Sequence, residues 1–541
     1  MIFGATPLAD ADGAVLAHSV TANGVRMKKG RRLGKDDLDV LAKAGIVEVV
    51  AARLEVGDVD EDTAANAIAR ACQGAGASLQ AAFTGRCNLY ADTPGVVVID
   101  KERVDAMNRI HEAVTISTLA PYEAVVEGQM LATIKIIPFA APQEAVDRAV
   151  KIASAGSPLV ALAPYRSRQA GLIMTTLPGT KDKILNKTAD VLRARLVTLG
   201  SNLAGERRCA HESAEIAKSV SAQLTQGLDP ILIFGASAIT DRRDEVPSGI
   251  VAAGGEVLHF GMPVDPGNLL LLAKHGEVSV IGLPGCARSP KLNGFDWVLQ
   301  RLLADRLVGR DQIMAMGAGG LLKEIPSRPQ IRTGAAADVP KAPRITAIIL
   351  AAGQSRRMGP DNKLLAEIDG KAMLARVVEA AKASQVVDIS AVTGHEADQV
   401  KATLARYAIP TVHNTKFAEG LSTSLQVGIS ALSEKFDGMI VLLGDMPRIS
   451  ANHIDRLIAA FNPLEGRAIC VPTYQGKRGN PVLFGEQFFA EMTQVSGDSG
   501  AKHLIGEYEE ELVEVPMDDD GIFLDVDTPD ALAGIRATDV G

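Results

Sequence analysis

Residues 345–359 of the chain read ITAIILAAGQSRRMG and decide how its C-terminal part folds. The apolar run that opens this stretch is long enough for one buried strand and stops at Gly353, and two arginines, a second glycine and Lys363 follow. A turn after a strand can bring backbone N–H groups and cationic side chains onto phosphate oxygens, and glycine has no Cβ to hold a ligand away. The stretch predicts a phosphate-binding turn, and an ordinary turn with solvated arginines is the alternative.

The composition bounds the class of protein. At 541 residues the chain needs several domains, and 47% hydrophobic with 22% charged residues is typical of a globular protein. The net charge of −9, with no basic stripe along the sequence, argues against nucleic acid as a partner. Five scattered cysteines without a C-x-x-C pair favour a reducing compartment. Because we find neither a signal-peptide pattern nor an apolar run of roughly 18 residues, we expect a cytoplasmic protein with no membrane partner.

The chain divides into four segments by pattern. Residues 1–165 predict a small α+β region that includes an alanine-rich helix over residues 60–82. Residues 166–325 and 345–541 each alternate apolar strands with helices, which is typical of a sheet covered on both faces. Residues 326–344 are rich in proline and small residues and form a predicted linker. The fold class is therefore α/β, with two three-layer βαβ domains whose sheets are mostly parallel.

Two further stretches place carboxylates where strands end. Residues 439–443 predict a fully apolar strand that delivers Asp445 at its carboxyl end, where ligands bind in open α/β sheets. A carboxylate there is a candidate Mg²⁺ ligand, and a helix cap or turn is the alternative. Asp525 and Asp527 stand two residues apart on a predicted strand and so on one face. Asp527, nearer the strand end, is the candidate for a second metal ligand.

Five motifs in order resemble the molybdenum cofactor nucleotidyltransferases. They are LAAGQSRRMG with Lys363 from position 350, GDMP at 444–447, RGNP at 478–481, SGDSG at 496–500 and DVDTP at 525–529. The first motif has one residue more before Lys363 than the family pattern. LAAG in place of LAGG and the segment 419–425 are similar to the cytidylyltransferase branch. The resemblance implies a Rossmann-like nucleotidyltransferase fold for residues 345–541.

The resemblance also implies a reaction, in which the terminal phosphate of molybdopterin attacks the α-phosphorus of CTP and pyrophosphate leaves. Positioning and charge neutralisation dominate such a transfer. The implied catalytic residues are Arg356, Lys363 and Asp445. The implied nucleotide-binding residues are Leu350, Ala351, Ala352, Gly353, Arg357 and Gly359. Mg²⁺ is expected on Asp445 and Asp527. Ser422, Thr423, Ser424 and Asn480 are candidates for substrate binding, and local turn hydrogen bonds are their alternative role. Ala352 in place of glycine would narrow the base pocket toward cytosine.

The segment before the linker carries a second resemblance. Residues 234–247 read FGASAITDRRDEVP after a buried strand, and turn-rich segments follow at 263–268 and 282–289. They resemble the molybdopterin-binding domain shared by molybdopterin molybdenumtransferases and adenylyltransferases, and residues 1–165 are weakly similar to the start of the molybdenumtransferases. The first loop lacks the double glycine of that family, and Cys286-Ala287-Arg288 replaces its Asn-Pro-Val. The resemblance implies pterin binding here, with Ser237 and Asp244 at the site.

The expected function is thus a molybdenum cofactor cytidylyltransferase that binds molybdopterin through its N-terminal half. Tethering the two halves would raise the effective concentration of the pterin. The expected partners are CTP, molybdopterin and an acceptor molybdoenzyme or its chaperone. Two alternatives stay open: a GTP-dependent or other nucleotidyltransferase, and a non-catalytic molybdopterin carrier or insertion scaffold. The histidines at 395, 413, 453 and 503 show no spacing typical of a ligand set.

Overall fold

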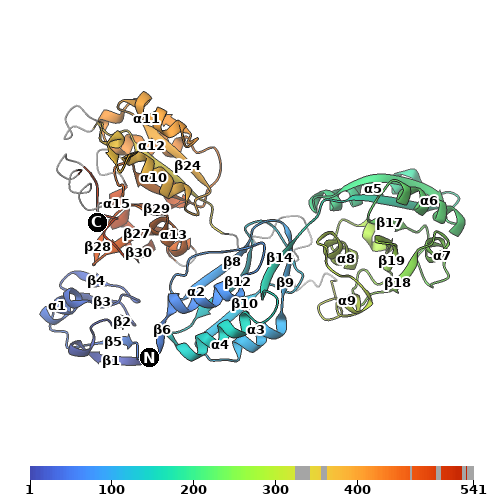
Figure 1. Cartoon of the computed structure of the whole chain (residues 1–541), viewed down its shortest axis with the longest axis horizontal. Helices are drawn as coiled ribbons and strands as arrows, with labels where there is room; N and C mark the ends of the chain where they lie inside the picture. Colours follow the sequence, from blue (N-terminus) through green and yellow to red (C-terminus); the bar gives the residue numbers. More distant parts are fainter. Residues whose placement is uncertain (323–341, 355–361, 464–465, 495–500, 527–531, 533–541) are drawn as a thin grey trace.

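The computed structural model describes residues 1–322, 342–354, 362–463, 466–494, 501–526 and 532. The chain forms four successive units, which we call the N-terminal lobe (1–55), the second domain (58–164), the third domain (165–322) and the C-terminal domain (from 342). The lobe lies beside the C-terminal domain, and the third domain lies at the far end of the molecule (Figure 1). Most of the expected linker, residues 326–344, lies outside the described residues.

The N-terminal lobe is a small sheet with one helix. Strand β5 (Glu48–Arg53) pairs antiparallel with β1 (Ile2–Pro7) and β2 (Val15–Leu16). The hairpin β3 (Val20–Ala22) and β4 (Val25–Met27) lies before helix α1 (Lys35–Lys43). Its core is a separate apolar cluster that includes Leu16, Met27 and Leu41.

The second domain packs three helices against antiparallel strands. Its two main sheets have the orders β10-β12-β8-β7 and β11-β9-β14. The strands are β6 (Asp58–Asp60), β7 (Ala77–Leu79), β8 (Arg86–Ala91), β9 (Gly95–Ile99), β10 (Val114–Thr118), β11 (Ala124–Val125), β12 (Met130–Ile136), β13 (Ala140–Pro142) and β14 (Val160–Pro164). The helices are α2 (Glu61–Cys72), α3 (Lys101–Asn108) and α4 (Gln143–Ala153).

The expected helix over residues 60–82 is shorter than predicted. It starts at its N-cap Asp60, whose side chain accepts from the N–H of Thr63, and it ends at Cys72. Two glycines then approach a neighbouring strand. A Cβ on Gly74 would lie 2.5 Å from the Cβ of Pro158, and Gly76 has a φ of +71°. Tertiary contact therefore turns the alanine-rich continuation into strand β7.

The third domain is a six-stranded sheet between two helical layers. Its order is β16-β15-β17-β20-β19-β18; the first four strands pair in parallel, and β19 pairs antiparallel with both β20 and β18. The strands are β15 (Gln169–Thr176), β16 (Asn202–Ala210), β17 (Ile231–Phe234), β18 (Glu256–Phe260), β19 (Leu271–His275) and β20 (Val278–Leu283). The helices are α5 (Asp182–Thr198), α6 (Ser213–Thr225), α7 (Glu245–Ala252), α8 (Gly294–Leu303) and α9 (Arg310–Met314). Leu172 and Ile173 point into separate clusters on opposite faces, because side chains alternate along a strand.

The C-terminal domain repeats this plan with eight strands. Strands β25, β24, β21 and β26 are parallel, β29 pairs antiparallel with β26, and β27, β28 and β30 complete the sheet. The strands are β21 (Ile345–Ala351), β24 (Asp388–Thr393), β25 (Thr411–His413), β26 (Gly438–Leu443), β27 (Ile469–Tyr474), β28 (Lys477–Arg478), β29 (Val482–Gly485) and β30 (Leu512–Pro516). A small hairpin joins β22 (Glu367–Ile368) and β23 (Lys371–Ala372). The α-helices are α10 (Met373–Lys382), α11 (Ala397–Ala405), α12 (Leu421–Ser430), α13 (Ala451–Ala460), α14 (Phe489–Met492) and α15 (Lys502–Glu507).

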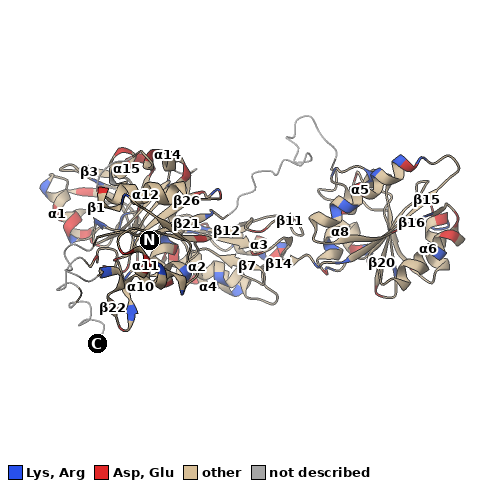
Figure 2. Ribbon diagram, turned by 90° about the horizontal axis from the view of Figure 1, so that it is seen from above, with Lys and Arg blue, Asp and Glu red and all other residues tan. Residues whose placement is uncertain are grey.

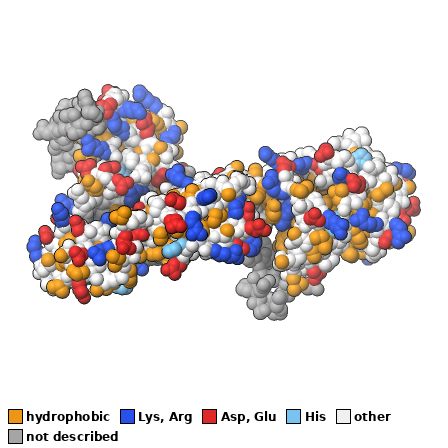
Figure 3. Space-filling view, turned by 60° about the horizontal axis from the view of Figure 1, so that its bottom comes forward, with side chains coloured by type: hydrophobic (Ala, Val, Ile, Leu, Met, Phe, Trp, Pro, Cys, Tyr) orange, Lys and Arg blue, Asp and Glu red, His pale blue; other side chains and the backbone are white. Residues whose placement is uncertain are grey.

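Both large sheets have a parallel core, as expected for mostly parallel sheets, and each also has antiparallel pairings toward one edge. All seven residues of β21 are buried, which matches its unbroken apolar run. Basic and acidic residues are interspersed along the ribbon in Figure 2, and their side chains are interspersed over the face shown in Figure 3. No helix within the described ranges is long and apolar enough to cross a membrane.

Candidate functional site

The carboxyl ends of β21 and β26 lie side by side and carry the central pair of the candidate site. Leu350 is paired with Leu443 in register, and the N–H of Gly444 donates to the carbonyl of Leu350 at 3.0 Å. Lys363 Nζ then lies 2.6 Å from Asp445 Oδ2. These side chains are only 12% and 18% exposed, so water screens the pair less than it screens a surface ion pair. Two residues 82 positions apart are brought into one charged contact.

The predicted phosphate-binding turn begins at the same edge. Leu350, Ala351 and Ala352 are buried, whereas Gly353 is exposed. A Cβ placed on Gly353 would meet no described atom within 4 Å, so no described residue crowds the backbone there. Arg356, Arg357 and Gly359, which were also predicted to contact the nucleotide, lie outside the described residues. The described part of the turn can therefore admit a ligand close to its backbone.

Ala352 packs against the neighbouring strand end. A Cβ on Gly394, which follows β24, would lie 2.8 Å from the Cβ of Ala352 and 2.6 Å from that of Phe417. The methyl group of Ala352 thus occupies the space that Gly394 leaves, and it fixes the wall between two strand ends.

The end of the C-terminal domain approaches Asp445 without forming the predicted strand. Residues 521–523 form a turn, and 524–526 have no regular structure, so the strand predicted across Asp525 and Asp527 is wrong in its described part. The N–H of Val526 donates to the carbonyl of Asp445 at 3.1 Å, which places the segment beside the Lys363–Asp445 pair. Asp525 is exposed, and Asp527 lies outside the described residues.

The candidate substrate-binding hydroxyls lie at the start of α12. Ser422 and Ser424 are buried, and Asn414 Nδ2 donates to Thr423 Oγ1 and to Ser424 Oγ, both at 2.9 Å. The hydroxyl of Thr423 donates to the carbonyl of Gly420 at 2.9 Å. The N–H of Asn414 donates to the carbonyl of Thr393, so the network lies at the carboxyl end of β24. Thr423 and Ser424 thus make the local hydrogen bonds of their alternative role.

Asn480 lies between β28 and β29, and its N–H donates to the carbonyl of Ile522 at 3.0 Å. Strand β29 begins opposite Val441, near the carboxyl end of β26. The structure therefore places Asn480 at the same edge of the sheet as Asp445.

In the third domain, Ser237 and Asp244 lie in the loop after β17. Asp244 is the N-cap of α7: its carboxylate accepts from the N–H of Glu245 at 2.8 Å and from that of Thr240 at 3.1 Å. Ser237 is exposed. Asp244 thus has a structural role that its position before a helix start predicts.

Three side chains that were not predicted as site residues lie at the carboxyl ends of the strands of the third domain. The hydroxyl of Thr175 lies 2.8 Å from His211 Nδ1 and accepts from the N–H of Ala236 at 2.7 Å. Arg288 donates to the carbonyl of Gly235 at 3.2 Å and stacks over Phe234 at 5.2 Å. Arg288 was visible as a departure from the family pattern, but Thr175 and His211 meet only through the pairing of β15 with β16.

Within the described residues, one group of side chains could hold a metal ion away from the strand edge. A group of three occurs at Glu491, His503 and Glu507, whose ligand atoms all lie within 4.8 Å of one another. His503 showed no ligand spacing in the sequence, because Glu491, on α14, joins His503 and Glu507 of α15 only in the fold. At the strand edge, Asp445 offers a carboxylate oxygen, the donor type that Mg²⁺ prefers.

Two segments of the chain match known domain families. Residues 347–512 match the MobA-like NTP transferase domain, and residues 5–53 match a domain of unknown function, DUF8806. The chain is 29% identical over 206 residues to the purine catabolism protein PucB of Bacillus subtilis (strain 168), a match that spans 36% of this chain and 98% of that protein.

Two solved structures are each similar to about a third of the chain. The Mycobacterium sp. strain JC1 homologue of Mycobacterium tuberculosis Rv0371c is 27% identical, with 36% of this chain and 97% of that chain covered and a TM-score of 0.33. Molybdopterin-guanine dinucleotide biosynthesis protein A of Archaeoglobus fulgidus is 17% identical, with 36% and 98% covered and a TM-score of 0.28.

Proposed function

We propose that the MobA-like NTP transferase domain of this chain transfers CMP from CTP to the terminal phosphate of molybdopterin, with release of pyrophosphate. The observation that carries the proposal is the Lys363–Asp445 pair, 2.6 Å apart, beside an open glycine turn at the carboxyl ends of β21 and β26. A cation, a carboxylate and free backbone space at one sheet edge suit a reaction between two phosphate groups.

In the proposed reaction the acidic residues would hold the metal ion and the basic residues would hold the phosphates. Asp445, joined by Asp527, would hold Mg²⁺, which supplies charge neutralisation on the phosphate oxygens when bound. Lys363 can leave Asp445 for an α-phosphate oxygen, because its ammonium sits on a flexible four-carbon stem. Arg356 and Arg357 would hold the triphosphate through paired N–H groups. The protein positions two anions and contributes no covalent intermediate.

Two finer points belong to the proposal. Ala352, packed against the position of Gly394, would shape the base pocket for cytosine. The third domain would bind molybdopterin at the strand edge that carries Ser237, Thr175 and Arg288. In this proposal residues 166–325 bind the pterin, residues 345–541 catalyse the transfer, and the linker connects the two.

The test is direct. The purified full chain is incubated with Mg²⁺, molybdopterin and each of the four nucleoside triphosphates in turn, and pyrophosphate and the nucleotide-linked pterin are measured. We expect product with CTP. Product with GTP and none with CTP would overturn the nucleotide assignment, and no product with any nucleotide would favour a carrier.

A further inference from the structure

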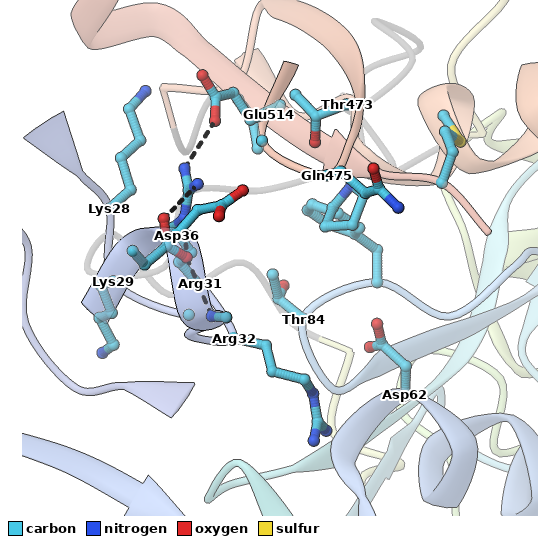
Figure 4. Close-up of a pocket in the computed structure, with 18 of the residues that line it drawn as sticks. Lys28, Lys29, Arg31, Arg32, Asp36, Asp62, Thr84, Thr473, Gln475 and Glu514 are labelled. Atoms are coloured by element: carbon cyan, nitrogen blue, oxygen red, sulfur yellow. Dashed lines mark hydrogen bonds and ion pairs between the residues drawn. The ribbon is translucent and has the colours of Figure 1, made fainter. Parts of the chain in front are cut away.

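A cavity of about 530 Å³ opens where the lobe, the second domain and the C-terminal domain meet. Side chains from all three units surround it, with Arg31 and Asp36 of the lobe on one side and Thr473 and Gln475 of the C-terminal domain on another (Figure 4). Its volume falls in the range of about 300–1,000 Å³ that is typical of small-molecule sites. Neither Lys363 nor Asp445 lines it, so it is a second site.

The lobe is held against the C-terminal domain by two of its cations. Lys28 Nζ donates to the carbonyls of Leu512 and Glu509, and Arg31 lies 4.0 Å from Glu514. Arg31 also pairs with Asp37 at 2.7 Å. These contacts fix the wall of the cavity, and they leave the charges of Lys28 and Arg31 already engaged by the protein.

Three other cations on this wall are available to a ligand. Lys29, Arg32 and Lys35 line the cavity and are exposed, and none of them pairs with a carboxylate within the described residues. Arg32 donates to the carbonyl of Gly13 at 3.3 Å and keeps further N–H groups for other acceptors. Asp36 and Asp37 lie on the same wall, but the lobe residues that line the cavity include five cations and only these two carboxylates. This excess of positive charge favours an anion, and phosphate in particular accepts from Arg and Lys.

The wall from the second domain has the opposite character. Glu61 and Asp62, from the first turn of α2, line the cavity and are half-buried. Asp62 accepts from the N–H of Gly85 at 2.7 Å, whereas the carboxyl group of Glu61 accepts no side-chain or backbone hydrogen bond from the described residues. Burial raises the pKa of both groups, that of Glu61 to about 7. A desolvated carboxyl group gains from an N–H donor that the protein itself does not supply.

We propose that this cavity binds a small molecule that carries a phosphate group at one end and N–H donors at the other. The phosphate lies against Lys29, Arg32 and Lys35, and the donors face Glu61 and Asp62. Because the walls belong to three units, the bound ligand favours the docked arrangement of the lobe and the C-terminal domain. The inference stands on the cavity alone and does not depend on the proposed transferase reaction.

Guanosine 5′-monophosphate is a suitable probe, because it joins a phosphate to a ring edge with N–H donors. Its binding to the full chain is measured by isothermal titration calorimetry in a Lys363→Ala background, which weakens binding of nucleotides at the transferase site. We expect the further double change Arg32→Ala/Lys35→Ala to weaken binding by about tenfold or more, since two charged hydrogen-bond donors are removed. The matched control is Lys183→Ala/Lys187→Ala on α5, which we expect to leave binding unchanged.

A second arm tests the acidic wall. We expect guanosine 5′-monophosphate to bind more tightly than inorganic phosphate, and Glu61→Ala to remove that difference. Hydrogen–deuterium exchange should show ligand protection in residues 28–37 and 473–476. Equal affinity in the Arg32→Ala/Lys35→Ala and control variants would overturn the phosphate end, and inorganic phosphate binding as tightly as the nucleotide would overturn the donor end. Failure of CMP transfer would affect neither result.

Discussion

We expect Asp445→Ala to abolish nucleotidyl transfer while the C-terminal domain stays folded. In the unaltered chain the Asp445 carboxylate lies 2.6 Å from the Lys363 ammonium, with both side chains less than a fifth exposed. Its removal leaves a partly buried cation without this partner, at a cost of about 1.5–3 kcal/mol for a hydrogen bond to a charged group. A domain with a free energy of unfolding of about 5–15 kcal/mol tolerates that loss.

The catalytic cost is expected to be larger than the structural one. Loss of a preorganised charge at the reacting phosphate typically reduces kcat by about a hundredfold to a thousandfold. Removal of a metal ligand adds to that loss. The assay is pyrophosphate release from CTP with Mg²⁺ and molybdopterin, alongside circular dichroism and urea unfolding of the same preparation.

Asp437→Ala is the matched control, because Asp437 stands before the amino end of the same strand, β26. Its exposed carboxylate accepts from the N–H of Arg344 at 2.7 Å, so the change removes a carboxylate hydrogen bond at the opposite end of the strand. We expect a stability loss with the transfer rate retained. A transfer rate in Asp445→Ala equal to that of the unaltered chain would remove Asp445 from the mechanism, and equal losses in both variants would make its role structural.

Three further outcomes are expected. Burial raises the pKa of Glu61 from 4.5 to about 7. Between these pH values the folded chain keeps a proton on Glu61 that the unfolded chain releases, so Glu61 lowers the free energy of unfolding as the pH rises. Urea unfolding should therefore show Glu61→Gln to be more stable than the unaltered chain by about 2–3 kcal/mol at pH 8 and little different at pH 4.5, and a pH-independent difference would contradict the shift. Arg195→Ala should destabilise the third domain by about 3–5 kcal/mol, because Arg195 pairs with buried Asp296 at 2.7 Å and donates to the carbonyls of residues 287, 289 and 291. A midpoint of thermal unfolding within about 1 °C of that of the unaltered chain would refute this. Residues 345–541 alone should retain CMP transfer but need more molybdopterin for half-maximal rate, and an unchanged requirement would exclude hand-over by the tethered third domain.

Local pattern predicted much of the sheet framework. The unbroken apolar run before Gly353 forms β21, which is buried throughout, and the second apolar run delivers Asp445 beside it. Such runs predict buried strands well, because a strand that is covered on both faces has apolar side chains along its whole length. The antiparallel strands at the sheet edges were missed, because the direction of a strand is set by its connections and partners.

The structure predicted for two segments is wrong for the same physical reason. Residues 73–82 are rich in alanine but leave the helix where Gly74 meets Pro158, and residues 521–526 form a turn that hydrogen bonds to Asp445. In both cases a contact with a distant segment outweighs a weak local propensity. The approach of Lys363 to Asp445, by contrast, agrees with the sequence-based prediction, because both residues follow adjacent strands of one sheet.

Local sequence is enough to specify that β21 and β26 are buried strands and that a glycine turn and a carboxylate follow them. The contact of Lys28 with the carbonyls of Leu512 and Glu509, 484 and 481 residues away, forms only in the folded chain, as does the cavity beside it, which has a mainly basic wall and an acidic one. Strand burial is encoded by neighbouring residues. The cavity is made of surfaces from three units, whose complementarity in shape and charge exists only once each has folded.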